Sequence, residues 1–130
     1  MNVKIDTKEK FTVITPIEAD ISANMTDELS VLLLNYADKP IPHVILNMKN
    51  VLTIAKEGGE KIASLQQQFY EKNCSFVICE LNEKIENLLE ESQLLEEMNT
   101  TPTESEAWDI VQMEEIEREL MADFDKDETE

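Results

Sequence analysis

Two short apolar runs separated by an amphipathic stretch set the predicted layout of the chain. The run His43–Met48 is rich in β-branched residues and too short for an independent helix, which is typical of a strand buried on both faces. The run Ser75–Cys79 has the same character. Between them, Gly58 and Gly59 precede Glu60–Tyr70, whose apolar residues recur at helical spacing. The pattern predicts a central strand, a glycine turn, a helix and a second strand parallel to the first.

The chain before the central strand predicts a hairpin and one helix. Asn2–Asp6 and Phe11–Thr15 are rich in β-formers and flank a polar turn, so they predict two antiparallel strands, the second ending at Pro16. Ile17–Asn24 is expected to be a connection. A helix is predicted from Thr26 to Ala37, with an apolar face formed by Met25, Leu29, Leu32, Leu33 and Tyr36.

Two further helices are predicted after the second buried strand. Asn82 is expected to cap a helix over Glu83–Glu91. Leu94–Thr101 fits either an extension of that helix or a short edge strand. Thr103 and Glu106 form a capping box that opens the last helix. Its apolar positions keep helical spacing and are Ala107, Ile110, Met113, Ile116, Leu120 and Phe124.

These elements predict an α/β or α+β layer structure. The expected sheet is mixed, with a parallel centre and a hairpin strand at one edge, and the helices lie mainly on one face. The length of 130 residues suits one domain over residues 1–122. Residues 123–130 are strongly acidic and are expected to form a fraying tail.

The acidic charge is concentrated in the last third of the chain. Residues 1–79 carry eight Lys and ten Asp or Glu, a net charge of −2, so residues 80–130 hold −16 of the total of −18. Such a surface repels nucleic-acid phosphates and anionic lipid headgroups, so neither nucleic-acid binding nor a membrane-surface role is expected. A basic protein partner is compatible with this acidic surface.

The chain is expected to be cytoplasmic. Its N-terminal residues lack the apolar stretch of a secretory signal, and no apolar run is long enough to span a bilayer. Cys74 and Cys79 suit a reducing compartment, and their spacing matches no metal or redox motif. Cys79 ends an apolar run and is expected to pack in the core.

No catalytic, cofactor or metal site is predicted. Gly58-Gly59-Glu60-Lys61 lacks the spacing of a phosphate-binding loop, and the carboxylates follow helix surfaces without forming a calcium-loop motif. His43, the single histidine, has no partner in a nucleophile motif, so a hydrogen-bonded structural role is expected. Trp108 either covers the edge of the core or stands half exposed as a binding anchor. The methionines expected to pack are Met48, Met98, Met113 and Met121.

The element order and the two buried strands resemble the STAS domain, the module shared by sulfate transporters and bacterial anti-sigma-factor antagonists. The residues that carry the resemblance are the initial hairpin, His43–Thr53, Gly58-Gly59 before a helix, and Ser75–Cys79. The likeness spans about residues 1–120 and implies an α/β, STAS-like mixed sheet. It also implies a non-enzymatic domain that binds a protein partner.

One departure from the family pattern concerns a phosphorylated turn. Antagonists of the family carry an Asp-Ser-Ser-Gly-like turn after the central strand, and a serine in it is phosphorylated by the anti-sigma-factor kinase, which ends binding. Read without gaps from Leu52, this chain has Lys56-Glu57-Gly58-Gly59 there, and the phosphoacceptor position falls on Gly58. We therefore expect no switching by phosphorylation at this position, with Glu57 either a fixed negative charge or a solvated turn residue.

The resemblance implies partner binding at the carboxyl end of the sheet and around the start of the Gly58 helix. The candidate partners are an anti-sigma-factor kinase, a transporter ATPase and a second copy of the chain. The alternative roles are an accessory subunit of a transporter or lipid-transport complex and a scaffold of a signalling assembly. The predicted binding residues are Asp20, Ser22, Asn24, Thr53, Lys56, Glu57, Gly58, Gly59 and Lys61.

Overall fold

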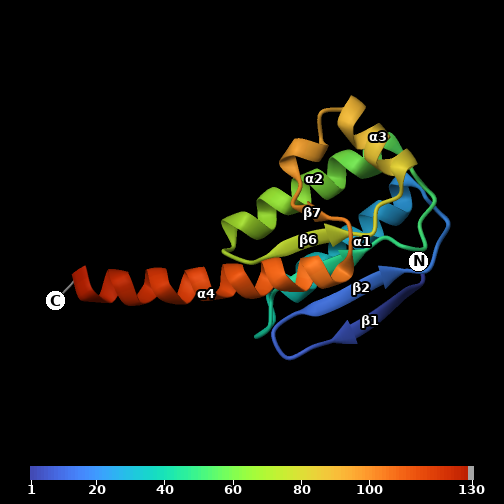
Figure 1. The fold of residues 1–130 in the computed structure, drawn as a ribbon. Helices are drawn as coiled ribbons and strands as arrows, with labels where there is room; N and C mark the ends of the chain where they lie inside the picture. The colour runs from blue at the N-terminus through green and yellow to red at the C-terminus, as the bar shows by residue number, and fades with distance from the viewer. Residues whose placement is uncertain (129–130) are drawn as a thin grey trace.

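A five-stranded mixed sheet forms the centre of the protein (Figure 1). The computed structural model describes the backbone of residues 1–128 and the side chains of residues 1–122. The strand order is β1-β2-β4-β6-β7, with β1 antiparallel to β2 and every other neighbouring pair parallel. The strands are β1 (Val3–Thr7), β2 (Thr12–Pro16), β4 (Val44–Asn47), β6 (Phe76–Cys79) and β7 (Thr100–Thr101).

The predicted centre of the sheet is confirmed. Strand β4 lies between β2 and β6, and Ile45 pairs with Val13 on one side and Val77 on the other. All four residues of β4 are buried, because both faces of the sheet are covered by helices. The stretch Leu94–Thr101 contains a short 3₁₀ helix, η1 (Leu95–Glu97), and then the edge strand β7.

Three helices cover one face of the sheet and the fourth covers the other (Figure 1). The first face carries α1 (Ala23–Ala37), α2 (Lys56–Glu71) and α3 (Glu83–Glu91), and the second carries α4 (Glu104–Glu128). The larger core lies under α1, α2 and α3, and the smaller one lies under α4. The predicted α/β arrangement, with helices mainly on one face, is therefore confirmed.

The side chains of β2, β4 and β6 divide between these two cores. In β4, Leu46 belongs to the larger core and its neighbour Ile45 to the smaller one, as the alternation of a strand requires. The smaller core consists of Phe11, Val13, Ile45, Val77, Cys79, Ala107 and Val111. Cys79 is fully buried in it, as expected.

Two helices begin earlier than predicted. Helix α1 starts at Ala23 because Ser22 caps it, with the Met25 N–H donating to Ser22 Oγ at 3.2 Å. Helix α2 starts at Lys56, so Gly58 and Gly59 lie inside its first turn and not in a glycine turn before it. Neither glycine has a positive φ, so neither is needed for a left-handed conformation.

A second, two-stranded parallel sheet was not predicted. It pairs β3 (Asp20–Ile21) with β5 (Thr53–Ile54), in the register Asp20 with Thr53 and Ile21 with Ile54. The sequence predicts a connection over residues 17–24, because a strand of two residues is too short to show a strand period. This small sheet lies at the carboxyl end of the main sheet and leads directly into α1 and α2.

Helix α4 is longer than predicted, and its exposed side is unexpected. The backbone stays helical to Glu128, so six residues of the segment expected to fray, 123–128, are helical, and residues 129–130 lie outside the described part of the chain. Its C-terminal half projects beyond the sheet (Figure 1). Met48 and Met98 are buried as predicted, but Met113 and Met121 are exposed, so the packing role expected for those two is wrong. The side chain of Phe124 is outside the described residues.

Candidate partner-binding site

The carboxyl end of the sheet brings together the N-termini of α1 and α2. The Ala55 N–H donates to the Ile21 carbonyl at 2.9 Å, which places the end of β5 beside the end of β3. Each of these strands passes within two residues into a helix. Thr53 Oγ1 also donates to Asp20 Oδ1. Two predicted site residues, 33 positions apart in the chain, are thus in direct contact.

Ser22 fixes the start of α1 with both its side chain and its backbone. Its hydroxyl caps the helix, and its carbonyl accepts a hydrogen bond from Thr26 Oγ1 at 2.9 Å. Thr26 is fully buried, so this bond holds its hydroxyl at a fixed position facing α2. Asn24 lies exposed in the first turn of α1.

Gly58 and Gly59 let α2 pack closely against its neighbours. A Cβ on Gly58 would lie 2.5 Å from Thr26 Oγ1, and a Cβ on Gly59 would lie 3.0 Å from Leu89 Cδ2. Both glycines are buried. They are therefore packing residues that a partner does not reach directly, and their effect on the site is to bring α1 and α2 together.

In the first turn of α2, the side chains that a partner can reach are those of its first two residues. Lys56 and Glu57 are exposed, and Ala55, the N-cap residue, offers no side-chain hydrogen bond to the helix. The N–H groups of the first turn carry the positive end of the helix dipole, which favours a carboxylate there. One turn later, Lys61 Nζ forms an ion pair with Asp27 Oδ1 of α1. The surface is therefore polar and of mixed charge.

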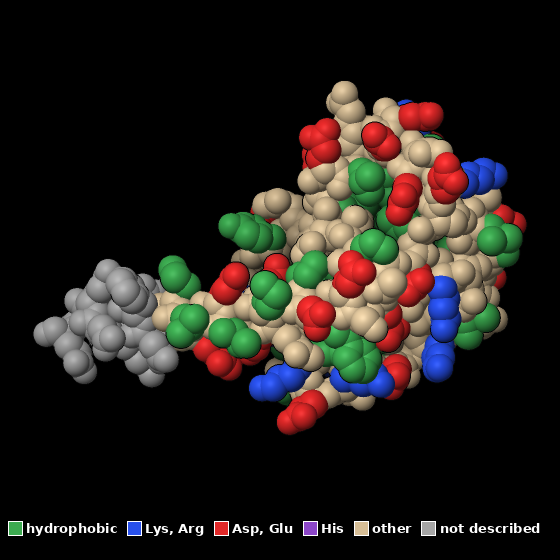
Figure 2. Space-filling model, in the orientation of Figure 1, with side chains coloured by type: hydrophobic (Ala, Val, Ile, Leu, Met, Phe, Trp, Pro, Cys, Tyr) green, Lys and Arg blue, Asp and Glu red, His purple; other side chains and the backbone are tan. Residues whose placement is uncertain are grey.

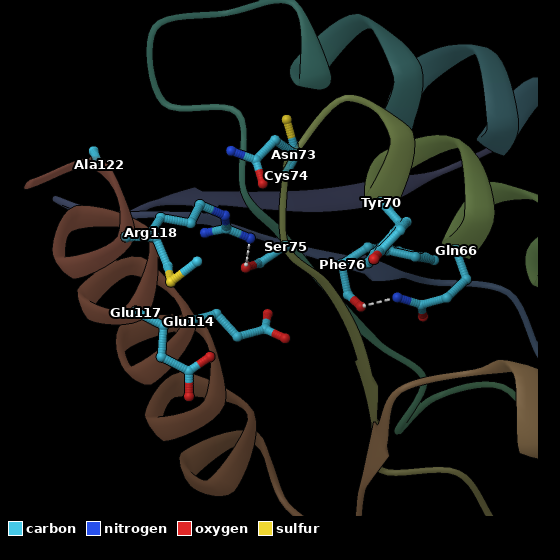
Figure 3. Close-up of a pocket in the computed structure, with 11 residues that line it drawn as sticks. Gln66, Tyr70, Asn73, Cys74, Ser75, Phe76, Glu114, Glu117, Arg118 and Ala122 are labelled. Atoms are coloured by element: carbon cyan, nitrogen blue, oxygen red, sulfur yellow. Dashed lines mark hydrogen bonds between the residues drawn. The ribbon is translucent and has the colours of Figure 1, made fainter. Parts of the chain in front are cut away.

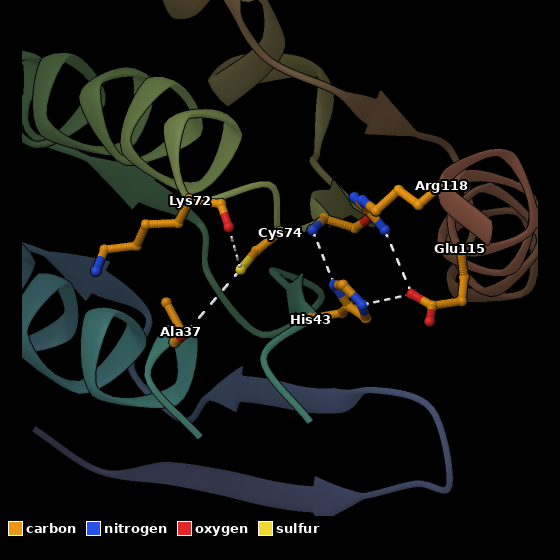
Figure 4. Close-up of polar contacts among 7 residues, drawn as sticks. Ala37, His43, Lys72, Cys74, Glu115 and Arg118 are labelled. Atoms are coloured by element: carbon orange, nitrogen blue, oxygen red, sulfur yellow. Dashed lines mark hydrogen bonds and ion pairs between the residues drawn. The ribbon is translucent and has the colours of Figure 1, made fainter. Parts of the chain in front are cut away.

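A second polar cluster lies at the opposite, amino end of the sheet (Figure 4). His43 is buried, its Nδ1 accepts from the Ser75 N–H at 3.0 Å, and its Nε2 lies 2.7 Å from Glu115 Oε2. Because Nδ1 accepts, the ring proton is on Nε2 and points at Glu115. Arg118 Nη2 donates to Ser75 Oγ at 2.6 Å. The hydrogen-bonded role expected of His43 is confirmed, and its partners fasten α4 to the sheet.

Burial controls the ionisation of the histidine and of the two thiols. Burial lowers the pKa of His43 below its usual 6.5, and Arg118 lowers it further, against the opposing effect of Glu115. Burial also raises the pKa of the Cys74 thiol. For Cys79, burial and the carboxylates of Glu104 and Glu80 raise the pKa to about 12. Neither thiol has the character of a nucleophile.

A groove of about 510 Å³ opens between the end of α2 and α4 (Figure 3). Gln66 and Tyr70 line it from α2, and Glu114, Arg118 and Met121 line it from α4. The guanidinium of Arg118 is already bonded to Ser75 and lies 3.5 Å from Glu115 Oε2. The groove therefore offers carboxylates and apolar edges, with its single arginine engaged by the protein itself.

Trp108 covers the edge of the smaller core. Its ring meets Phe11 edge-on with centroids 5.2 Å apart, and Lys8 Nζ lies 5.1 Å from the centroid of its ring. Its Nε1 donates to Glu104 Oε2 at 3.1 Å, and Glu104 Oε1 accepts from Asn47 Nδ2 at 2.9 Å. Of the two roles predicted for Trp108, the structure therefore shows the cover at the edge of the core.

Two negative findings concern the described residues. Among them, no group of three or more His, Cys, Asp or Glu side chains is arranged to hold a metal ion. None of the helices in this part of the chain has both the length and the apolar composition required to cross a membrane.

Sequence reasoning missed one local feature and several contacts between distant segments. The preference of serine for N-cap positions was the signal that could have moved the start of α1 to Ser22. The contact of Gly58 with Thr26, the pairing of β3 with β5 and the cluster of His43, Ser75, Glu115 and Arg118 had no local signal. Each joins residues more than 30 positions apart.

Comparison with known proteins gives a consistent family and fold. The family model described as the STAS domain matches residues 2–107. A protein of Thermotoga maritima described as an anti-sigma factor antagonist has a similar structure, with a TM-score of 0.76 and 16% identity over 85% of this chain and 94% of that one. A comparison with curated protein sequences found no match.

Two further solved structures have the same fold. A Ser-to-Glu variant of RsbS from Moorella thermoacetica has a TM-score of 0.71 and 15% identity over 86% of this chain and 96% of that one. The unphosphorylated anti-sigma factor antagonist SpoIIAA has a TM-score of 0.67 and 12% identity over 85% of this chain and 96% of that one. At these identities the likeness concerns the fold alone.

Proposed function

This chain belongs to the STAS domain family, and we propose that it is a non-enzymatic protein-interaction domain of the anti-sigma-factor-antagonist type. Its docking surface is the carboxyl end of the sheet, where α1 and α2 begin. The exposed groups there are Asp20, Ser22, Asn24, Lys56 and Glu57, with Thr53 and Lys61 partly exposed beside them. This surface offers hydrogen-bonding and charged groups on the rigid ends of packed elements, which suits recognition of a protein surface.

The single observation that carries the proposal is the pairing of an exposed Glu57 with a buried Gly58. Position 58 has no room for a hydroxyl side chain, because its Cβ would already lie 2.5 Å from Thr26 Oγ1. If the glycine of the family's Asp-Ser-Ser-Gly turn is aligned with Gly58, the serine before it corresponds to Glu57. We therefore propose Glu57, and not Gly58, as the equivalent of the phosphoacceptor.

Glu57 then acts as a fixed negative charge in place of a phosphoserine. It lies in the first turn of α2, where the helix dipole favours a carboxylate by about 0.3–1 kcal/mol. A phosphoserine carries more charge than a carboxylate, so the imitation is partial. The domain is held near the state that its switchable relatives reach only when phosphorylated, and its affinity for an anti-sigma-factor kinase is correspondingly weak.

Calorimetric titration against the anti-sigma-factor kinases of the same host tests this function. We expect Glu57→Ser and Glu57→Gln to bind a kinase at least about ten-fold more tightly than the parent, because both remove the charge. The matched control is Glu60→Ser, which removes an exposed charge from the same helix one turn later and is expected to match the parent.

Two results would contradict the proposal. Equal affinity of the parent and both Glu57 variants would exclude the fixed-charge role. Binding of a transporter ATPase at this surface, independent of Glu57, would assign the domain to a transporter complex instead.

A further inference from the structure

Helix α4 has apolar side chains on two opposite sides. Ala107 and Val111 are fully buried against the sheet. Met113, Ile116 and Leu120 follow at spacings of three and four residues, which puts them on one stripe, turned away from the sheet. Their exposed fractions are between 55% and 64%. We call these three residues the outer stripe, and Figure 2 shows hydrophobic side chains in a row along this helix.

The apolar surface continues beside the outer stripe onto the groove. Met121 of α4 and Tyr70 of α2 both line the groove and are more than 60% exposed. Exposed large apolar side chains gathered in this way mark an interaction site, whereas single ones do not. The segment of α4 between Met113 and Leu120 is also held to the sheet, because Arg118 donates a hydrogen bond to Ser75 and Glu115 contacts His43. The outer stripe is therefore presented on a firmly anchored element.

The charge around the stripe selects the kind of partner. Residues 104–122 hold seven Asp or Glu and one Arg, and that Arg is turned inward to Ser75. Glu117 and Glu119 lie exposed on either side of the stripe, and Asp109 lies at its start. A second copy would bring two such acidic helices together, and an anionic membrane would be repelled in the same way. A cationic protein segment is the complementary occupant.

We propose that the outer stripe of α4 is a docking surface for a basic amphipathic helix of another protein. The apolar face of that helix covers Met113, Ile116 and Leu120, and its Lys and Arg side chains meet Asp109, Glu117 and Glu119. This is helix-on-helix recognition through apolar anchors at spacings of three and four residues. Glu115 and Arg118, within the span of this surface, contact His43 and Ser75 immediately before β4 and β6, so the surface lies toward the amino end of the strands. It is therefore separate from the Glu57 surface and does not depend on its function.

The test uses the full chain and a labelled synthetic helix. The probe is an 18-residue peptide of Leu and Lys with one apolar face, and a scrambled peptide of the same composition is its control. Fluorescence anisotropy gives the dissociation constant. We expect the amphipathic peptide to bind at least about ten-fold more tightly than the scrambled one, because only its apolar residues share a face.

Matched variants assign the binding to the outer stripe. The stripe variant is Met113→Gln, Ile116→Gln and Leu120→Gln, in which Gln preserves helix propensity. The control variant is Ile17→Gln, Val31→Gln and Leu52→Gln, three similarly exposed apolar residues outside α4. We expect the stripe variant to weaken binding about ten-fold or more and the control to change it less than about two-fold. Circular dichroism checks that both fold.

A second pair of variants tests the charge. Asp109→Asn, Glu117→Gln and Glu119→Gln remove three charges beside the stripe, and Glu83→Gln, Glu86→Gln and Glu90→Gln remove three exposed charges from α3. We expect only the first set to weaken binding markedly. Equal loss in the two sets, or in the stripe and control variants, would overturn the proposal. A dimer in sedimentation that the stripe variant dissociates would assign the surface to a second copy, and binding to phosphatidylserine vesicles would assign it to a membrane.

Discussion

Gly58 and Thr26 lie so close together that a single methyl group cannot be placed between them. A Cβ on Gly58 would lie 2.5 Å from Thr26 Oγ1, and that hydroxyl is held by its bond to the Ser22 carbonyl. The contact joins the first turns of α1 and α2, so it positions both helix N-termini at the proposed docking surface. The free energy of unfolding of variants at Gly58 and Thr26 tests this contact.

The first prediction is that Gly58→Ala lowers the free energy of unfolding by about 1–2 kcal/mol. Overpacking a buried site costs about 1–3 kcal/mol, and the gain in helix propensity offsets about 1 kcal/mol or less of it. Chemical denaturation measures the change. Gly59→Ala is the control, because its Cβ would meet terminal methyls of Leu89 at 3.0 Å and of Leu94 at 3.5 Å, and it is expected to lie within about 0.5 kcal/mol of the parent.

A double variant identifies the cause of that loss. Thr26→Ala removes the atom that Gly58→Ala would strike, so the Gly58→Ala change should cost less in the Thr26→Ala background than in the parent. Full additivity of the two changes would show that the contact with Thr26 is not the source of the cost.

The second prediction concerns the stability of the fold at acidic pH. Burial lowers the pKa of His43 in the folded chain below 6.5, so the unfolded chain binds this proton at a higher pH than the folded one. The contribution of neutral His43 to stability is therefore complete above about pH 6.5 and decreases as the pH falls from there toward the folded pKa. Protonation of Nδ1 also removes the bond from the Ser75 N–H.

Denaturation curves between pH 7.5 and 5.5 measure this effect. His43 is the single histidine of the chain, so His43→Asn should flatten the pH dependence in this window, by at most about 1.4 kcal/mol per pH unit. Parallel pH profiles for the parent and His43→Asn would show that the proton is not bound at His43.

The third prediction concerns the thiols. With a pKa of about 12 and complete burial, Cys79 should be unreactive toward a disulfide reagent at pH 8 in the folded protein. Cys74→Ser isolates Cys79 for this measurement. Reaction of one thiol per chain should appear only after unfolding in guanidinium, and a stoichiometric reaction within minutes in native buffer would contradict the burial of Cys79.

The fourth prediction is that an anti-sigma-factor kinase places no phosphate on the start of α2. Gly58 has no hydroxyl, Thr53 Oγ1 is engaged with Asp20, and Ser64 lies two turns inside the helix. Mass spectrometry after incubation with kinase and ATP should find residues 53–64 unmodified, while Glu57→Ser should become phosphorylated at the new serine. Phosphate on Thr53 or Ser64 of the parent would show that the site has a different acceptor.

The local pattern of the sequence by itself determined most of the elements. The short, near-continuous apolar run of residues 43–48 and its β-branched residues predicted the central strand β4, and the spacing of Ile85, Leu88 and Leu89 after Asn82 predicted α3 with its observed bounds. These features follow from side chains a few positions apart, which is the range over which strand and helix periods act. The resemblance to the family, drawn from the same elements, identified the segment that contains Glu57, and the structure places that segment in the first turn of α2.

Only the tertiary structure decided which of these residues meet and which remain outside. The apolar positions predicted for the last helix share a helical spacing that includes Ala107, Met113, Ile116 and Leu120, yet the sheet covers Ala107 and leaves the other three exposed. Val111, which is buried beside Ala107, was not among the predicted positions. Likewise, Gly58 and Gly59 suggested a turn until α1 and α3 were seen packed against them. A helical period predicts that residues share a face of the helix. Which face is buried depends on the segments that pack against the helix from elsewhere in the chain, and those contacts have no signal in the local sequence.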